Sequence, residues 1–171
     1  MPPKNPRLYV ARTKNKNPSA EPEWEFVIAS YSTKKFCNKI CLTTSLSPAT
    51  NTFARNYQNV PVTVSQTSNY VVIVCVAKIQ DYERFYNILK AQSTPQKIKA
   101  ISSRLWVQGI INALNEDIGA LGTKVTDWET VGPKTVDFMK RMIQKETDLT
   151  SGGSVPLCDL LTGHEIPFHN P

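Results

Sequence analysis

The N-terminal half of the chain alternates apolar and β-branched segments with clusters of Pro, Asn, Ser and Thr. Short segments of this kind, bounded by turn-forming residues, are typical of β-strands. The run Val71–Val76 is continuously apolar, which favours a central strand covered on both faces. The predicted strands are Leu8–Ala11, Phe26–Ala29, Phe36–Leu42, Thr52–Tyr57, Val60–Val64 and Tyr70–Ile79.

The C-terminal half shows apolar residues at helical spacing, which predicts three helices. The first is capped by Asp81 and runs through Lys90, and the third begins at Pro133, whose ring suits a first helical turn. In the second helix, Ser103 lies one turn before Val107 on the face expected to be buried. The second and third helices are predicted over 102–114 and 133–145, and the apolar stripes of all three comprise Tyr82, Phe85, Ile88, Leu89, Val107, Ile110, Ile111, Leu114, Val136, Met139 and Ile143.

Together these elements predict an α+β fold, with an antiparallel sheet from the N-terminal half packed with about three helices from the C-terminal half. A length of 171 residues suits one domain. Residues 1–20 are interpreted as a basic N-terminal arm and residues 21–150 as the single α+β domain. Residues 151–171 are interpreted as a Gly/Ser joint followed by a C-terminal docking tail, in which 155–161 is the hydrophobic anchor.

The sequence offers no pattern for membrane insertion or cofactor binding. Its longest apolar run, Tyr70–Ala77, is too short to span a bilayer, and the first residues do not resemble a signal peptide. The paired glycines Gly152 and Gly153 precede an extended segment instead of a helix, so they do not form a phosphate-binding loop. We therefore expect a cytoplasmic or otherwise intracellular protein without a cofactor.

Net charge is concentrated at the N-terminus. The chain carries a formal charge of +6, and five cations precede the first acid, Glu21, so the remainder is nearly neutral. Such an arm could bind nucleic acid through counterion release. Tyr9 is the only aromatic residue among the first 20, and no RNA-binding module is recognisable, so an arm that is solvated or docked on a protein is favoured. The candidate contact residues are Lys4, Arg7, Arg12, Lys14 and Lys16.

Neither disulfides nor a metal site is expected from the cysteines. Cys37, Cys41, Cys75 and Cys158 lack CxxC spacing, and Cys75 sits in an apolar run where a free thiol behaves as a small hydrophobe. Cys37 and Cys41 lie four apart on one predicted strand, so free thiols are favoured there as well. The tail contains residue types that can bind metals, but their spacing matches no closed zinc pattern: Cys158, His164, Glu165 and His169.

Several motifs, taken in order, give the chain a resemblance to a family of uncharacterised fungal proteins. The most specific are a GT-x-V-x-DW stretch, Gly122–Trp128, and a VP-x-x-DLL-x-G ending, Val155–Gly163. The resemblance covers nearly the whole chain. Its remaining pieces are Arg7–Ala11, Trp24–Ala29, Asn69–Lys78, Leu105–Val107 and Ala120–Leu121.

That family in turn resembles permuted papain-like proteins of the lecithin:retinol acyltransferase type. The resemblance implies a His-Trp pair opening one strand, a second polar residue on the next strand and an Asn-Cys pair starting a helix. In such a site the helix dipole and an imidazolium favour the thiolate. Here Glu23 precedes Trp24, Cys37 falls at the second polar position, and Ser103 stands at the nucleophile position.

With these substitutions the resemblance implies an inactive site. Glu23 is a poor base for a serine hydroxyl, and an alignment shifted to Glu25 changes nothing chemically. The two histidines, His164 and His169, lie in a tail that is a loose platform for positioned chemistry.

We therefore expect a noncatalytic papain-like domain, a pseudoenzyme, that acts as a protein-interaction or assembly module. Its partner would be another protein, a further copy of the chain or a larger assembly, including a particle such as a fungal virus capsid. The alternatives are a weak thiol or serine hydrolase or acyltransferase, using Ser103 or Cys37, and nucleic-acid binding through the basic arm. Trp24, Trp106 and Trp128 are expected to be core or interface anchors.

Overall fold

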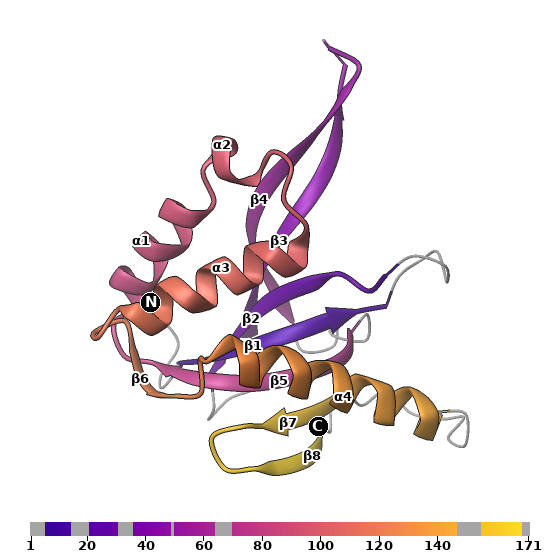
Figure 1. Ribbon diagram of the computed structural model, residues 1–171, viewed down its shortest axis with the longest axis vertical. Helices are drawn as coiled ribbons and strands as arrows, with labels where there is room; N and C mark the ends of the chain where they lie inside the picture. The colour runs from indigo at the N-terminus through magenta and orange to yellow at the C-terminus, as the bar shows by residue number, and fades with distance from the viewer. Residues whose placement is uncertain are drawn as a thin grey trace.

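The computed structural model describes residues 6–14, 21–30, 36–48, 50–63, 70–146 and 155–168. Within these residues, eight strands form one open sheet and four helices pack beside it (Figure 1). The strands are β1 (Pro6–Thr13), β2 (Trp24–Ser30), β3 (Phe36–Ser47), β4 (Thr52–Thr63), β5 (Tyr70–Ile79), β6 (Leu121–Lys124), β7 (Val155–Asp159) and β8 (His164–Phe168). The helices are α1 (Tyr82–Gln92), α2 (Pro95–Ile98), α3 (Ser103–Glu116) and α4 (Trp128–Glu146).

The sheet has the order β4-β3-β2-β1-β5-β7-β8, with β6 paired to β5. All the pairs among β1 to β5 are antiparallel, as predicted for the N-terminal half. The β5–β7 pair is parallel, because the chain returns to the sheet after a long helical crossover. The segment 155–161, predicted as a hydrophobic anchor that docks on the body, contains β7 and joins the sheet through it.

The first strand corrects the interpretation of residues 1–20 as a separate arm. β1 lies between β2 and β5, so Arg7 and Arg12 belong to the middle of the sheet. The side chain of Arg7 forms an ion pair with Asp159 of β7, with 2.8 Å between Nη1 and Oδ2. Lys14 follows β1 and is exposed, whereas Lys4 and Lys16 lie outside the described residues.

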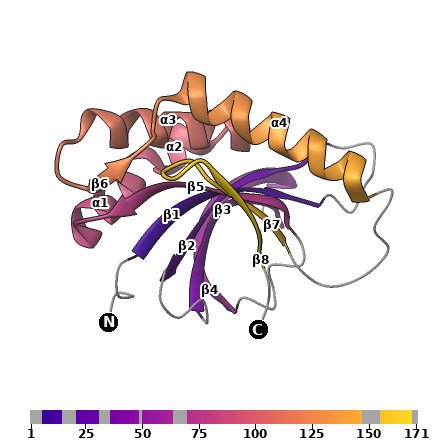
Figure 2. The same cartoon turned by 90° about the horizontal axis from the view of Figure 1, so that it is seen from below.

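The helices cover one face of the sheet (Figure 2). The expected stripe of α3 is fully buried, and Trp106 of the same helix packs against Phe26 of β2, with 5.8 Å between ring centroids. The indole Nε1–H of Trp106 donates a 3.1 Å hydrogen bond to Ser93 Oγ, so its one polar atom is satisfied inside the core. β5 is central, and Val71–Val76 is buried throughout, as predicted.

Two of the predicted helices begin where the sequence places them. Asp81 caps α1 by accepting a hydrogen bond from the Arg84 amide, and Ser102 caps α3 through the Leu105 amide. α4, however, begins at Trp128, five residues before the predicted start at Pro133. The short helix α2 was not predicted. Ile143 is 47% exposed, which corrects its assignment to the inward stripe of α4.

The β3–β4 hairpin extends beyond the body of the molecule (Figure 1). The predicted strands Thr52–Tyr57 and Val60–Val64 are one continuous strand, β4, up to Thr63, and Val64 lies outside the described residues. β4 is the edge strand of the sheet, where Pro61 is tolerated because its missing N–H removes no bond of a central ladder.

A second apolar cluster lies on the sheet face opposite the helices. Tyr9, Val27, Ile73 and Leu157 contribute to it from four different strands, and all four are buried. Glu25 of β2 is also buried and forms an ion pair with Lys39 of β3, with 2.9 Å between Oε1 and Nζ. In the part of the chain that the structure describes, no helix is long and apolar enough to cross a membrane.

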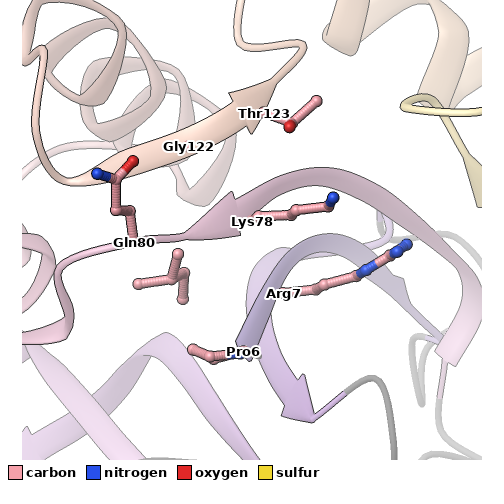
Figure 3. Close-up of a pocket in the computed structure, with 7 residues that line it drawn as sticks. Pro6, Arg7, Lys78, Gln80, Gly122 and Thr123 are labelled. Carbon is pink, nitrogen blue, oxygen red and sulfur yellow. The ribbon is translucent and has the colours of Figure 1, made fainter. Parts of the chain in front are cut away.

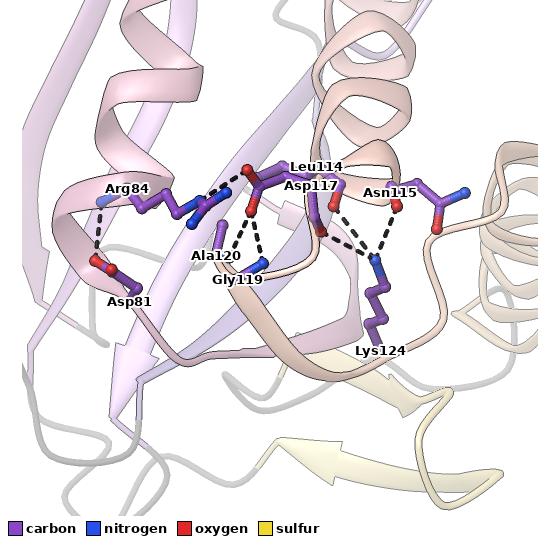
Figure 4. A network of polar contacts seen from close by, with 8 residues as sticks. All are labelled: Asp81, Arg84, Leu114, Asn115, Asp117, Gly119, Ala120 and Lys124. Carbon is purple, nitrogen blue, oxygen red and sulfur yellow. Dashed lines mark hydrogen bonds and ion pairs between the residues drawn. The ribbon is translucent and has the colours of Figure 1, made fainter.

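Asp117 organises the turn that follows α3 (Figure 4). Its Oδ1 accepts hydrogen bonds from the amides of Gly119 and Ala120, at 2.9 and 2.7 Å, and its Oδ2 accepts from Arg84 Nε at 2.8 Å. Lys124 Nζ donates to the last carbonyl oxygens of α3, which have no partner within the helix. This network fixes the C-terminal end of α3 against α1 and β6.

We expect an Asp117→Asn variant to be less stable than the wild type at neutral pH, by a margin that shrinks in acid. The pKa of Asp117 is lowered, mainly by the hydrogen bond from the Ala120 amide and also by Arg84. A carboxyl group with a lowered folded-state pKa stabilises the fold above its unfolded pKa, about 3.9, and loses that contribution as pH falls through the folded value. Denaturant unfolding at pH 7 and pH 3 measures the two margins; equal margins would contradict this role.

Candidate functional site

The start of α3 lies against the start of β2, and Ser103 makes the contact. The Trp24 amide donates a 3.1 Å hydrogen bond to Ser103 Oγ. Ser103 is 5% exposed, so its hydroxyl is held inside the junction between the helix and the sheet. The neighbouring Ser102 caps the helix, which leaves Ser103 as the residue that joins α3 to β2.

A cleft of about 340 Å³ opens beside this junction. Glu23 and Ser103 both line it, so the structure brings together two of the three positions that the sequence singled out. Arg55 reaches the cleft from β4 and Arg104 from the first turn of α3, which adds two cations that the sequence analysis did not identify. The remaining lining residues are Glu21, Pro22, Trp24, Ser102 and Leu105.

A second cleft, of about 500 Å³, adjoins the first and shares Glu21, Pro22, Trp24 and Arg104 with it. Its floor includes Arg12 of β1. The guanidinium carbon of Arg12 lies 4.3 Å from the centroid of the Trp24 ring, a cation–π arrangement. Trp24 in turn packs against Trp128 of α4, with 5.4 Å between ring centroids. The strands β1 and β2 and the helix α4 therefore meet at one charged and aromatic junction.

Cys37 does not lie at this junction. In the β2–β3 register it is opposite Ala29, whereas Phe26 is opposite Ile40, so Cys37 is five residues along β2 from Trp24. At about 3.4 Å per residue this is roughly 17 Å of strand. The side chain of Cys37 is outside the described part of the structure. Its backbone position alone separates it from Ser103.

Glu25 and His164 are also distant from Ser103. Adjacent residues of a strand point to opposite faces, and Glu25 pairs with Lys39 on the face away from the helices. His164 lies in β8, four strand spacings from β2, which is about 19 Å at about 4.8 Å each. His169 lies outside the described residues. In the described part of the chain, no histidine is in reach of the Ser103 hydroxyl.

A third cleft, of about 650 Å³, lies where β1 begins and β5 ends (Figure 3). Arg7 and Lys78 are register partners on these strands and bring two positive charges to its wall. Gln80, Gly122 and Thr123 form another side of the cleft. Arg7 is already paired with Asp159 and Lys78 is exposed to water, so this cleft differs from the one beside Arg12, where the cation is buried.

The thiols and the C-terminal residues show no metal-binding geometry in the described ranges. Cys41, Cys75 and Cys158 are buried free thiols, as predicted. Burial raises the pKa of Cys41 to about 11 and that of Cys75 to about 12, so both stay protonated and unreactive near neutral pH. Glu165 pairs with Arg141 of α4, and no group of three or more His, Cys, Asp or Glu side chains is arranged to hold a metal ion among the described residues.

These observations define a mixed α/β protein with an open eight-stranded sheet, a helical layer on one face and adjoining clefts at the start of α3. The chain belongs to a family of unknown function, DUF6914, whose model matches residues 5–167. The match includes β1 and β7, in agreement with their place in the sheet. No curated protein and no solved structure matches the chain significantly.

Proposed function

We propose that this chain is a noncatalytic domain on a papain-like scaffold, and that it acts as a protein-interaction module by pairing the edge strand β4 with β4 of a second copy. The observation that carries the proposal is the β3–β4 hairpin. Leu46 and Phe53 are register partners near its tip, and they are 50% and 76% exposed. A projecting apolar pair of this kind is typical of an interaction surface.

The two edges of the sheet differ in a way that supports pairing at β4. β8 is five residues long and includes Glu165 and Pro167, features that protect a natural edge strand from pairing. β4 has twelve residues, and its only charged residue is Arg55. No described strand pairs with its outer edge. Pro61 limits pairing to the nine residues before it, Thr52–Val60.

A second copy is the partner that suits this edge. Two identical antiparallel edges that meet about a two-fold axis are complementary by symmetry, because each residue pair occurs twice. The strand brings one arginine from each copy, so the electrostatic repulsion between them is small. The exposed Phe53 of each copy would be covered as the two sheets join into one.

The geometry of Ser103 supports the noncatalytic part of the proposal. A serine nucleophile transfers its proton to a base within hydrogen-bond reach, and that base is held by a third group. Ser103 Oγ instead accepts a backbone hydrogen bond in a nearly closed position. Glu21 and Glu23 are the acids that share its cleft, and a carboxylate is a weak base for a serine hydroxyl.

Sedimentation velocity across a range of protein concentrations tests the association. The proposal predicts a species of twice the 19.2 kDa chain mass at high concentration, in equilibrium with the single chain on dilution. A constant mass of one chain at every concentration would contradict pairing with a second copy.

A fluorophosphonate probe is expected to leave Ser103 unlabelled in the native protein, because no described base activates its hydroxyl. Mass spectrometry of peptides that contain residue 103 measures the labelling, and Ser103→Ala is the matched control. Labelling of the wild type that disappears in Ser103→Ala would favour a hydrolase or acyltransferase instead. A thiol probe with Cys37→Ala tests the other candidate nucleophile in the same way.

A further inference from the structure

Arg12 is a buried arginine in an apolar strand. It follows Leu8 and Val10 on the face of β1 that packs against the helices, and it is 3% exposed. Its guanidinium lies over the Trp24 ring and lines the 500 Å³ cleft described above. A charge in this position normally has a paired carboxylate, because removing a charge from water is costly.

The side chain of Arg12 has no such partner among the described residues. Its Nε is buried without a hydrogen bond, and no described carboxylate forms an ion pair with it. The pKa of Arg12 is lowered to about 10, chiefly by burial and further by Arg104, although Glu21 and Glu23 both attract its charge. The fold therefore holds a cation whose charge the chain itself leaves poorly compensated.

The cleft provides both charge and apolar surface around this group. Arg12, Arg104 and Lys140 bring three positive charges to the cleft, and Glu21 and Asp137 bring two negative charges. Glu23, which also attracts Arg12, lies in the adjoining cleft together with Arg55, and these two charges offset each other, so one positive charge remains. Apart from the charged residues, Trp24 and Gly132, the residues that line the cleft are apolar: Pro22, Pro133, Val136 and Met139. A volume of about 500 Å³ is within the range of small-molecule sites, roughly 300–1,000 Å³.

We propose that this cleft binds a small carboxylate whose apolar part packs on Pro22, Pro133, Val136 and Met139 while its carboxylate accepts hydrogen bonds from Arg12. A single negative charge neutralises the excess in the cleft, whereas a phosphate dianion would reverse it. A guanidinium is well matched to a carboxylate because its N–H groups can donate in pairs. The site is separate from the outer edge of β4 and goes beyond the proposed association.

Titration of the full chain with hexanoate, followed by the NMR signal of the Arg12 Nε–H, tests the inference. We expect a saturable shift of that signal with hexanoate, and much smaller effects with hexanamide, which lacks the charge, and with inorganic phosphate, which lacks the apolar part. Equal shifts with hexanamide would show that the negative charge of the ligand does not contribute to binding, which would contradict the proposal. A stronger response to phosphate would assign the cleft to phosphorylated ligands, and no response to any of them would overturn the proposal.

Two variants locate the binding site. Arg12→Met is expected to raise the dissociation constant for hexanoate by about thirtyfold or more, since it removes one side of a buried charge pair. Arg55→Gln changes only the neighbouring cleft and is expected to bind as the wild type does. If Arg12→Met fails to fold, Arg104→Gln, which removes a second cation of the cleft, is expected to weaken binding at least severalfold. Equal affinity in every folded variant would place the ligand elsewhere.

Discussion

Replacing Trp106 by alanine is expected to lower the free energy of unfolding by about 4 kcal/mol, because Phe→Ala and Trp→Ala changes in cores cost about 3–5 kcal/mol. Trp106 is 2% exposed and packs against both Phe26 of β2 and Tyr57 of β4. The substitution would leave a cavity between α3 and the sheet. It would also leave Ser93 Oγ without its hydrogen-bond donor.

Denaturant unfolding measures this loss, and the adjacent Leu105→Ala provides a matched control. Leu105 belongs to the same helix but is 55% exposed, so its truncation is expected to change the unfolding free energy by less than about 1 kcal/mol. Trp106→Phe should fall between the two, since it keeps most of the apolar volume. A cost below about 1 kcal/mol for Trp106→Ala would contradict the packing of α3 on the sheet.

A Leu46→Lys/Phe53→Lys double variant is expected to abolish self-association. The two side chains face each other across β3 and β4, so the change places two charges at one exposed point of the hairpin. The change also removes the apolar surface that the pairing would cover. Lysine on an edge strand also opposes strand pairing. Sedimentation velocity should therefore show only the single chain at concentrations where the wild type associates.

Ile118→Lys is the control for a general effect of added charge. Ile118 is the most exposed of the large apolar residues that the structure describes, at 93%, and it lies in the turn between α3 and β6, away from the hairpin. We expect this variant to associate as the wild type does. Loss of association in Ile118→Lys but not in the double variant would move the interface away from the hairpin.

The sequence predicted the parts of the fold that local chemistry determines. Asp81 and Ser102 mark the starts of α1 and α3 because their side chains accept hydrogen bonds from free helical amides. The start of α4 could not be predicted from Pro133 in the same way. The helix extends back to Trp128, whose ring packs on Trp24, a residue more than a hundred positions away. Tertiary packing therefore decides that boundary.

The local sequence also did not determine whether β4 is continuous or where β1 lies in the sheet. The polar residues Gln58 and Asn59 suggested a break between two strands, but in β4 the strand continues through them. Nothing local tells which strand is at the edge of the sheet. The basic residues before Glu21 suggested an arm, whereas Leu8–Ala11 already carried a strand pattern. The pairing of β1 with both β2 and β5 brings Arg7 and Arg12 into the sheet.

The candidate site could be predicted only in part, because helical spacing places some of its residues and strand pairing places the others. Ser103 could be placed on the buried face of α3 by helical spacing, whereas its hydrogen bond from the Trp24 amide is visible only in the structure. Cys37 could not be excluded without the β2–β3 register, which puts it at the other end of β2. Arg12 had a detectable signal, since it continues the inward face of β1 after Leu8 and Val10. The basic residues on either side of it in the sequence indicated an arm instead.

Amide hydrogen exchange of β4 tests the pairing of two copies most directly. The backbone N–H groups on the outer edge of Thr52–Val60 are predicted to exchange more slowly as the protein concentration rises, while those of β8 at the opposite edge remain unchanged. In the Leu46→Lys/Phe53→Lys variant, β4 should exchange at the same rate at every concentration. Concentration-independent exchange of β4 in the wild type, under conditions where association is observed, would contradict the account.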